Sequence, residues 1–98
     1  MKLTIDFQEG FDGDEAVVSV DGHKRLTLNE LTTDYAIGRA ESRAWDERVG
    51  ELKIVVEVPN RHLSKALTIE MEEPVFLGIY IEDEALAYRL QEQPFVYF

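Results

Sequence analysis

Apolar and polar residues alternate along most of this chain, and this period of two limits the folds that it can adopt. In KLTIDFQ, Leu3, Ile5 and Phe7 fall on one side and polar residues fall on the other. Successive side chains of a β-strand point to opposite faces, so this pattern is typical of a strand with one buried face. The alternation recurs in EAVVSVD, ELKIVVEV, LSKALTIEM and ALAYRLQ. The chain is therefore expected to be all-β.

Turn residues separate these runs at short intervals. The turn signals are Asp21-Gly22, Pro59-Asn60, Glu72-Glu73-Pro74 and Glu82-Asp83-Glu84. Short strands joined by such turns are typical of a sandwich or a barrel. We expect an antiparallel β-sandwich of seven to nine strands, in a single domain over residues 1–98. The expected core comprises Leu3, Ile5, Phe7, Val18, Val20, Leu52, Ile54, Val56, Leu67, Ile69, Leu77, Ile79, Leu86 and Leu90.

Two hairpins can be given a register, because only some pairings place apolar residues opposite apolar residues. The first would join the runs on either side of Pro74, and the second would join the runs on either side of Asp83. The expected pairs are Met71–Val75, Ile69–Leu77 and Leu67–Ile79 in the first hairpin, and Ile81–Leu86, Ile79–Tyr88 and Leu77–Leu90 in the second.

The Asp21-Gly22 turn is harder to assign. A loop of only these two residues would place Val18 opposite Arg25 if the pairing were regular. We therefore expect a longer loop, which gives the pairs Val18–Leu26 and Val20–Lys24 and keeps the buried face apolar.

Residues 34–50 allow two interpretations. Ala40, Ala44 and an Arg43–Glu47 pair fit a short helix that ends near Gly50. The alternative is a strand over residues 33–37, a polar bend, and a second strand over residues 42–46 that forms a hairpin through Gly50. Because Gly38 would cost a helix about 1 kcal/mol, we favour the strands.

The charge of the chain limits its partners. Asp and Glu number 20 against 10 Lys and Arg, which gives a formal net charge of -10. A surface this negative repels phosphate backbones and anionic lipids, so neither nucleic acid nor a membrane is an expected partner. The chain has no Cys, and Thr4 and Asp6 interrupt any apolar signal-peptide segment. These features predict a cytoplasmic protein without disulfides.

The stretch EGFDGDEA is the one candidate for a metal site. Asp12, Asp14 and Glu15 could offer oxygen ligands to calcium. Their spacing is not that of an EF-hand, and Gly10 and Gly13 suit a connection between two strands. We favour the connection, and we expect neither calcium nor another cofactor to bind.

No arrangement of residues indicates catalysis. His23 and His62 lie at turn signals, and no Ser lies in a G-x-S-x-G context. The favoured function is therefore a non-enzymatic binding or assembly module with a protein partner, of basic charge or a second copy of the chain. One alternative is a carbohydrate-binding or carbohydrate-processing sandwich with Trp45, Tyr35 and Tyr80 as an aromatic platform. A minor alternative is a DNA mimic that occupies a basic protein.

Apolar residues supply the candidate contact surface. In PVFLGIYIE both faces are apolar, so Phe76 and Tyr80 need a cover on the second face. The sequence then ends in Phe95, Val96, Tyr97 and Phe98. We expect this tail to be ordered, docked on its own chain or at an interface with a second copy, because uncovered aromatic patches mark contact surfaces.

Two stretches resemble a known class of module. VVSVDG and GELKIVVEVP are similar to the opening and closing strands of small bacterial immunoglobulin-like or transthyretin-like sandwich modules. The resemblance implies a sandwich fold. It implies no functional residue, because such modules share a fold and not a function.

Overall fold

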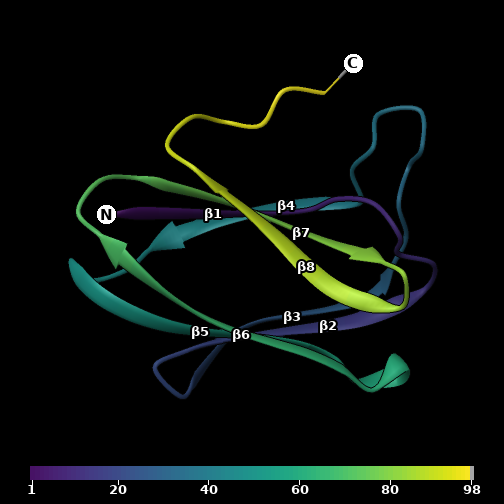
Figure 1. Ribbon diagram of the computed structural model, residues 1–98, viewed down its shortest axis with the longest axis horizontal. Coiled ribbons are helices and arrows are strands. Elements are labelled where there is room, and N and C mark those ends of the chain that lie inside the picture. The colour runs from purple at the N-terminus through teal and green to yellow at the C-terminus, as the bar shows by residue number, and fades with distance from the viewer. Residues whose placement is uncertain (98) are drawn as a thin grey trace.

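The computed structural model describes residues 1–97, which form two stacked four-stranded sheets (Figure 1). Sheet A has the strand order β4-β1-β7-β8, and sheet B has the order β3-β2-β5-β6. The elements are β1 (Lys2–Phe7), β2 (Asp14–Val20), β3 (His23–Leu31), β4 (Glu41–Asp46), β5 (Gly50–Val58), the 3-10 helix η1 (Pro59–Arg61), β6 (Leu63–Met71), β7 (Val75–Glu82) and β8 (Ala85–Gln91). The predicted all-β sandwich is confirmed, with eight strands.

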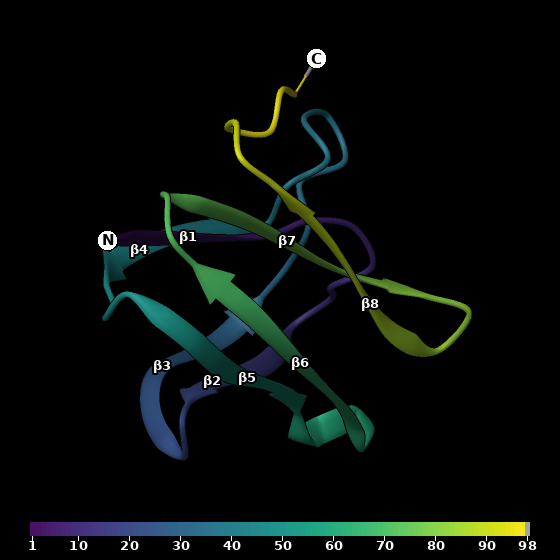
Figure 2. The same ribbon diagram turned by 60° about the vertical axis from the view of Figure 1, so that its left-hand side comes forward.

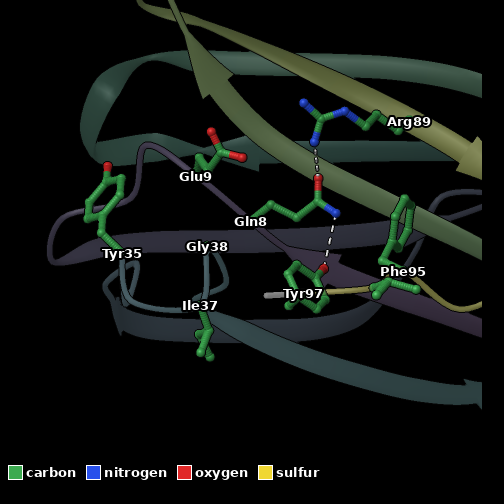
Figure 3. Close-up of a pocket in the computed structure, with 9 residues that line it drawn as sticks. Gln8, Glu9, Tyr35, Ile37, Gly38, Arg89, Phe95 and Tyr97 are labelled. Carbon is green, nitrogen blue, oxygen red and sulfur yellow. Dashed lines mark hydrogen bonds between the residues drawn. The ribbon is translucent and has the colours of Figure 1, made fainter.

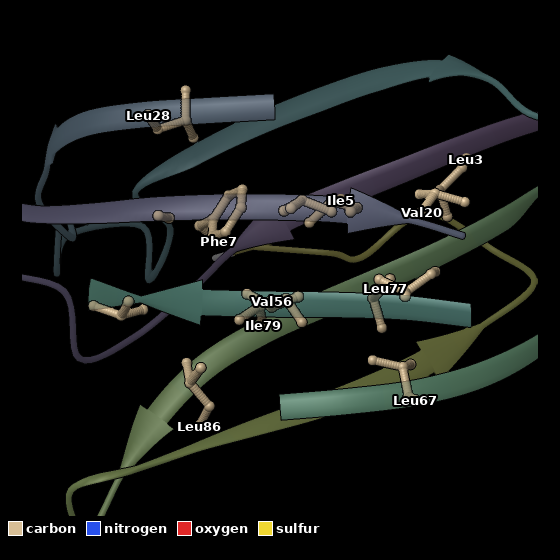
Figure 4. Packing of buried hydrophobic residues seen from close by; sticks show 14 of the residues in the cluster. Leu3, Ile5, Phe7, Val20, Leu28, Val56, Leu67, Leu77, Ile79 and Leu86 are labelled. Atoms are coloured by element: carbon tan, nitrogen blue, oxygen red, sulfur yellow. The ribbon is translucent and has the colours of Figure 1, made fainter. Parts of the chain in front are cut away.

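The core lies between the two sheets and is made by the alternating apolar residues (Figure 4). Thirteen of the fourteen expected core residues are buried there, together with Phe11, Ala16 and Met71. The rings of Phe7 and Phe11 meet edge to face at a centroid distance of 5.8 Å. Leu90 was expected in the core but is exposed. Its strand, β8, lies at the edge of sheet A, where the facing sheet gives less cover.

Of the two expected hairpins, only the second forms. β7 and β8 pair with the predicted register, in which Ile81, Ile79 and Leu77 lie opposite Leu86, Tyr88 and Leu90. The expected β6–β7 hairpin is wrong, because the chain crosses from sheet B to sheet A between these strands. β7 instead runs parallel to β1, with Leu3 opposite Val75 and Ile5 opposite Leu77. The apolar face of β7 is buried in either arrangement, so the alternation did not distinguish them.

The first turn is shorter than expected. Val20 lies opposite His23, so the loop contains only Asp21 and Gly22, whose φ angles are 50° and 81°. Positive φ at both positions is typical of the tight I′ hairpin turn. The expected Val20–Lys24 pair is therefore wrong, whereas Val18–Leu26 is confirmed. A β-bulge explains both results, because Arg25 is an extra residue on β3 that restores the apolar register.

Residues 34–50 contain one strand and no α-helix. The expected strand over residues 42–46 is confirmed as β4. The expected strand over 33–37 is wrong, because residues 35–38 form turns closed by a bridge between Asp34 and Arg39. The hairpin through Gly50 is also wrong, because β4 pairs with β1 in sheet A while β5 belongs to sheet B. Among residues 1–97, no helix is long and apolar enough to span a membrane.

Candidate binding pocket on the outer face of sheet A

A glycine in the middle of β7 allows a side chain to cross the outer face of sheet A. Gly78 is buried, and a Cβ atom at this position would come within 2.7 Å of the amide of Gln8. Gln8 follows β1, and its backbone N–H donates to the carbonyl of Ile79 at 2.7 Å. The absence of a side chain at Gly78 therefore gives Gln8 the space to lie flat over β7.

A continuous chain of hydrogen bonds runs across this face (Figure 3). Arg89 Nη1 donates to Gln8 Oε1 at 2.9 Å, and Gln8 Nε2 donates to the hydroxyl of Tyr97 at 3.1 Å. Tyr97 donates in turn to Asp6 Oδ2 at 2.6 Å, and Ser42 donates to Asp6 Oδ1 at 2.5 Å. The buried Asp6 carboxylate and Gln8 amide are thus supplied with partners, which fixes their positions.

The tail is bound to this network through Tyr97. Burial, and after it the bond to the Asp6 carboxylate, together raise the pKa of the Tyr97 hydroxyl to about 12, against the opposing effect of Gln8. The hydroxyl is therefore protonated at neutral pH and can act as the donor to Asp6. The Arg39 guanidinium lies 5.3 Å from the centre of the Tyr97 ring. In this structure residues 95–97 of the tail dock on their own chain.

A pocket of about 450 Å³ opens beside the network. It is lined by residues from the end of β1, the 35–38 turn, β8 and the tail (Figure 3): Gln8, Glu9, Tyr35, Ile37, Gly38, Arg89, Phe95, Val96 and Tyr97. Three of the apolar lining residues are conspicuously exposed, Tyr35 at 71%, Ile37 at 41% and Val96 at 74%. The pocket thus combines a fixed polar floor with an apolar rim.

Arg89 is the cation of this pocket, and two contacts hold it. Its guanidinium lies 4.1 Å from the centre of the Tyr80 ring, a distance at which a cation is attracted to the face of the ring. Gln8 accepts one of its N–H groups. A guanidinium has five N–H groups, so further donors are available to a ligand.

Five of the six expected interface residues lie on this outer face. Phe95, Val96 and Tyr97 line the pocket, and Tyr80 lies against Arg89. Phe76 alternates with buried neighbours on β7 and is half-buried on the same face as Tyr80. Phe98 lies outside the described residues. The fold thus brings these five residues to one face of sheet A. Their role in contacting a partner stays a prediction.

Sequence reasoning missed Gln8 and Arg89, although one signal pointed to them. A glycine inside an otherwise apolar strand marks a place where another group approaches the backbone closely. Gly78 is such a glycine. Finding Gln8 and Arg89 also required the strand neighbours, because β1 and β8 both pair with β7.

The three candidate ligands of EGFDGDEA, Asp12, Asp14 and Glu15, do not converge on one point. Asp14 is 1% exposed and binds Arg61 through both carboxylate oxygens, at 2.8 Å from Nε and 2.7 Å from Nη2. It also accepts hydrogen bonds from the Asn60 side chain and the Asp12 backbone N–H. Burial alone would raise the pKa of Asp14, but these bonds outweigh it and lower the pKa below its ordinary value.

The other two candidate ligands, Asp12 and Glu15, are consistent with a structural role for the loop. Asp12 is exposed, and the backbone N–H of Glu15 donates to Asn60 Oδ1 at 2.9 Å. Residues 1–97 contain no group of three His, Cys, Asp or Glu side chains arranged to hold a metal ion. The loop thus connects β2 to η1 through hydrogen bonds. The expectation that calcium does not bind here stays a prediction.

The remaining candidate residues are dispersed. His23 and His62 are exposed at turns. Trp45 lies on β4, packs against the core and donates to Glu47 Oε2 at 2.7 Å. The expected aromatic platform therefore lacks its tryptophan, because Tyr80 and Tyr35 belong to the outer face and its pocket.

Comparisons with models of known protein families, with curated proteins and with solved structures found no match for this chain. The two stacked sheets by themselves place the chain among all-β sandwich proteins. The finer resemblance to immunoglobulin-like or transthyretin-like modules stays a prediction.

Proposed function

We propose that this chain is a non-enzymatic binding module that contacts a protein partner through the pocket on the outer face of sheet A. The observation that carries the proposal is the exposure of Tyr35, Ile37 and Val96 around a floor held by hydrogen bonds. Exposed apolar side chains grouped on one surface are typical of a contact site.

The composition of the pocket suits a protein contact. Tyrosine and arginine are the residue types that most often contribute large binding energies at interfaces. Here the rim offers Tyr35, while Arg89 is held against Tyr80 and Gln8. Because these side chains are already positioned, binding would cost little conformational entropy.

The test is a capture experiment from native cell extract with three baits. The first is the parent chain, the second is the double variant Ile37→Ser, Val96→Ser, and the third is Val49→Ser. All three positions are exposed, so the variants should fold, and Val49 is not among the residues that line the pocket. We expect a protein that binds the first and third baits and is reduced at least about tenfold on the second, the effect of losing about 1.4 kcal/mol of binding energy.

One result would remove the proposal. If every protein captured by the parent chain is captured equally by the double variant, the pocket is not the contact site. Circular dichroism of the three baits controls for folding, since all should give the same strand-rich spectrum.

A carbohydrate ligand is a second candidate, favoured by one observation. The exposed Tyr35 shares the pocket with the planar polar groups of Gln8, Glu9 and Arg89. Such groups can hydrogen-bond to sugar hydroxyls while an aromatic ring contacts the sugar face. Shifts of the Tyr35 and Gly38 amide resonances on addition of oligosaccharides would favour this candidate, and unchanged spectra would remove it.

A further inference from the structure

The inner face of β8 is not covered along its whole length. Leu86, Tyr88 and Leu90 share this face, but their exposure rises along the strand from 6% to 41% and 48%. Their neighbours on β7 are Ile81, Ile79 and Leu77, which are all buried. The apolar surface therefore becomes exposed at the edge strand itself. This surface is separate from the pocket of the outer face.

The arrangement of the strands explains the exposure. β8 is the last strand of sheet A and β6 is the last strand of sheet B, and within residues 1–97 no strand pairs with the free edge of β8. Figure 2 shows β8 continuing at its end into the tail. The Lys65 ammonium, 5.9 Å from the centre of the Tyr88 ring, gives Tyr88 only a partial cover. An edge strand of this kind presents unpaired backbone N–H and C=O groups beside apolar side chains.

Negative charge flanks both ends of this edge. Glu82 ends β7, Asp83 and Glu84 form the turn into β8, and all three are exposed. At the other end Glu92 borders a hollow of about 210 Å³ together with Glu70, Glu72 and Glu73. The edge therefore suits a partner that carries positive charge around an apolar strand.

We propose that the free edge of β8 binds an extended segment of a basic partner protein by strand addition. Backbone hydrogen bonds to β8 would supply the pairing, and alternate apolar side chains would cover Tyr88 and Leu90. Lys and Arg side chains of the segment would lie near residues 82–84 and near Glu92. The proposal goes beyond the proposed function, because it adds a second contact surface with its own partner chemistry.

Charge also argues against a second copy at this edge. Two β8 strands paired antiparallel would bring residues 82–84 of one copy toward Glu92 of the other. Like charges placed together disfavour that pairing. The occupant that fits the edge is therefore a basic segment.

The test uses a synthetic probe. It is an acetylated and amidated peptide of alternating Val and Lys, of about seven residues to match the length of β8. We expect saturable shifts of the β8 amide resonances, slower hydrogen exchange on that strand, and a Kd on the order of 100 μM. The double variant Tyr88→Lys, Leu90→Lys should weaken binding at least about tenfold, whereas the exposed Val49→Lys should not weaken it.

Three controls make the test decisive. The matching peptide of Val and Glu should not bind, and a rise in salt from about 50 to about 500 mM should weaken binding of the Lys peptide. Sedimentation of the parent chain should show a monomer at low salt. The proposal is overturned if the Glu peptide binds equally, if the shifts fall on β3, β4 or β6, if the Lys double variant folds and binds like the parent chain, or if β8 already pairs with a second copy.

Discussion

At the scale of single residues, the pair of Asp14 and Arg61 joins a buried carboxylate to a guanidinium through two hydrogen bonds. Arg61 donates to both oxygens of Asp14 and also to the carbonyl of Gly10 at 3.0 Å. A single side chain from η1 therefore fixes the loop before β2. Asp14, one of the three candidate metal ligands, thus binds a cation that belongs to the chain itself.

Arg61→Ala should be strongly destabilising, because it leaves the Asp14 carboxylate buried without its countercharge. We expect a loss of about 2 to 3 kcal/mol in the free energy of unfolding, since about a third of the Arg61 side chain is exposed and a fully buried pair would cost about 3 to 5 kcal/mol. Urea unfolding of the parent chain and the variant measures this loss of stability. The control Arg43→Ala breaks an exposed pair with Glu41 and should cost less than about 1 kcal/mol.

The same pair predicts how this loss depends on pH. The folded pKa of Asp14 lies below its ordinary value of 3.8, so its contribution to stability is present above pH 3.8 and is lost as the pH falls through the folded pKa. The difference between the parent chain and Arg61→Ala should therefore be constant near neutral pH and shrink below pH 3.8. A difference that stays constant at acid pH would contradict this assignment.

At the scale of elements, the sequence predicted the strands and their faces better than their neighbours. The alternation of apolar and polar residues indicates which side of a strand is buried. This prediction was right for β5 and for most of β7. It does not state which strand lies alongside. The linker at residues 72–74 could therefore serve either a hairpin or a crossover between the sheets, and the hairpin was the wrong choice.

The candidate site was predictable only in part for the same reason. The apolar tail and the outer face of β7 are visible in the sequence as aromatic residues without an obvious cover. The contact of Gln8 with Arg89 joins residues 81 positions apart and depends on the parallel pairing of β1 with β7. No local pattern encodes a contact of that kind.

Gly78→Ala should disrupt β7 through its contact with Gln8 rather than through the backbone. The added methyl group would lie within 2.7 Å of the Gln8 amide, which must move and lose its bonds to Arg89 and Tyr97. We expect a cost of about 1 to 3 kcal/mol and a fall in Tm of roughly 4 to 8 °C per kcal/mol. Thermal unfolding followed by circular dichroism measures the change.

The control is a double-mutant cycle with Gln8→Ala. Removing the Gln8 side chain also removes the clash, so Gly78→Ala should cost much less in that background. Equal costs in the two backgrounds would show that the glycine is required for another reason.

At the scale of the whole molecule, charge and apolar surface are distributed separately. The formal charge of -10 is spread over the exposed positions, with acids concentrated in the turns that flank β8. The apolar rim lies over the outer face of sheet A. A basic partner would be steered by the general field of the protein, while the local apolar groups would determine where it docks.

The parallel pairing of β1 with β7 has a consequence for the order in which the protein folds. All four strands of sheet B lie within residues 14–71, whereas β1 lies between β4 and β7 and has both neighbours only after β7, which begins at Val75, has joined the sheet. Closing so long a loop is slow, and domains dominated by distant pairings typically refold in milliseconds to seconds. In pulse-labelled hydrogen exchange, the amides of β5 and β6 should be protected before those of β1; earlier protection of β1 would reverse this order. During synthesis β1 would leave the ribosome before the strands of sheet B, yet it would gain its second neighbour only after that sheet had formed.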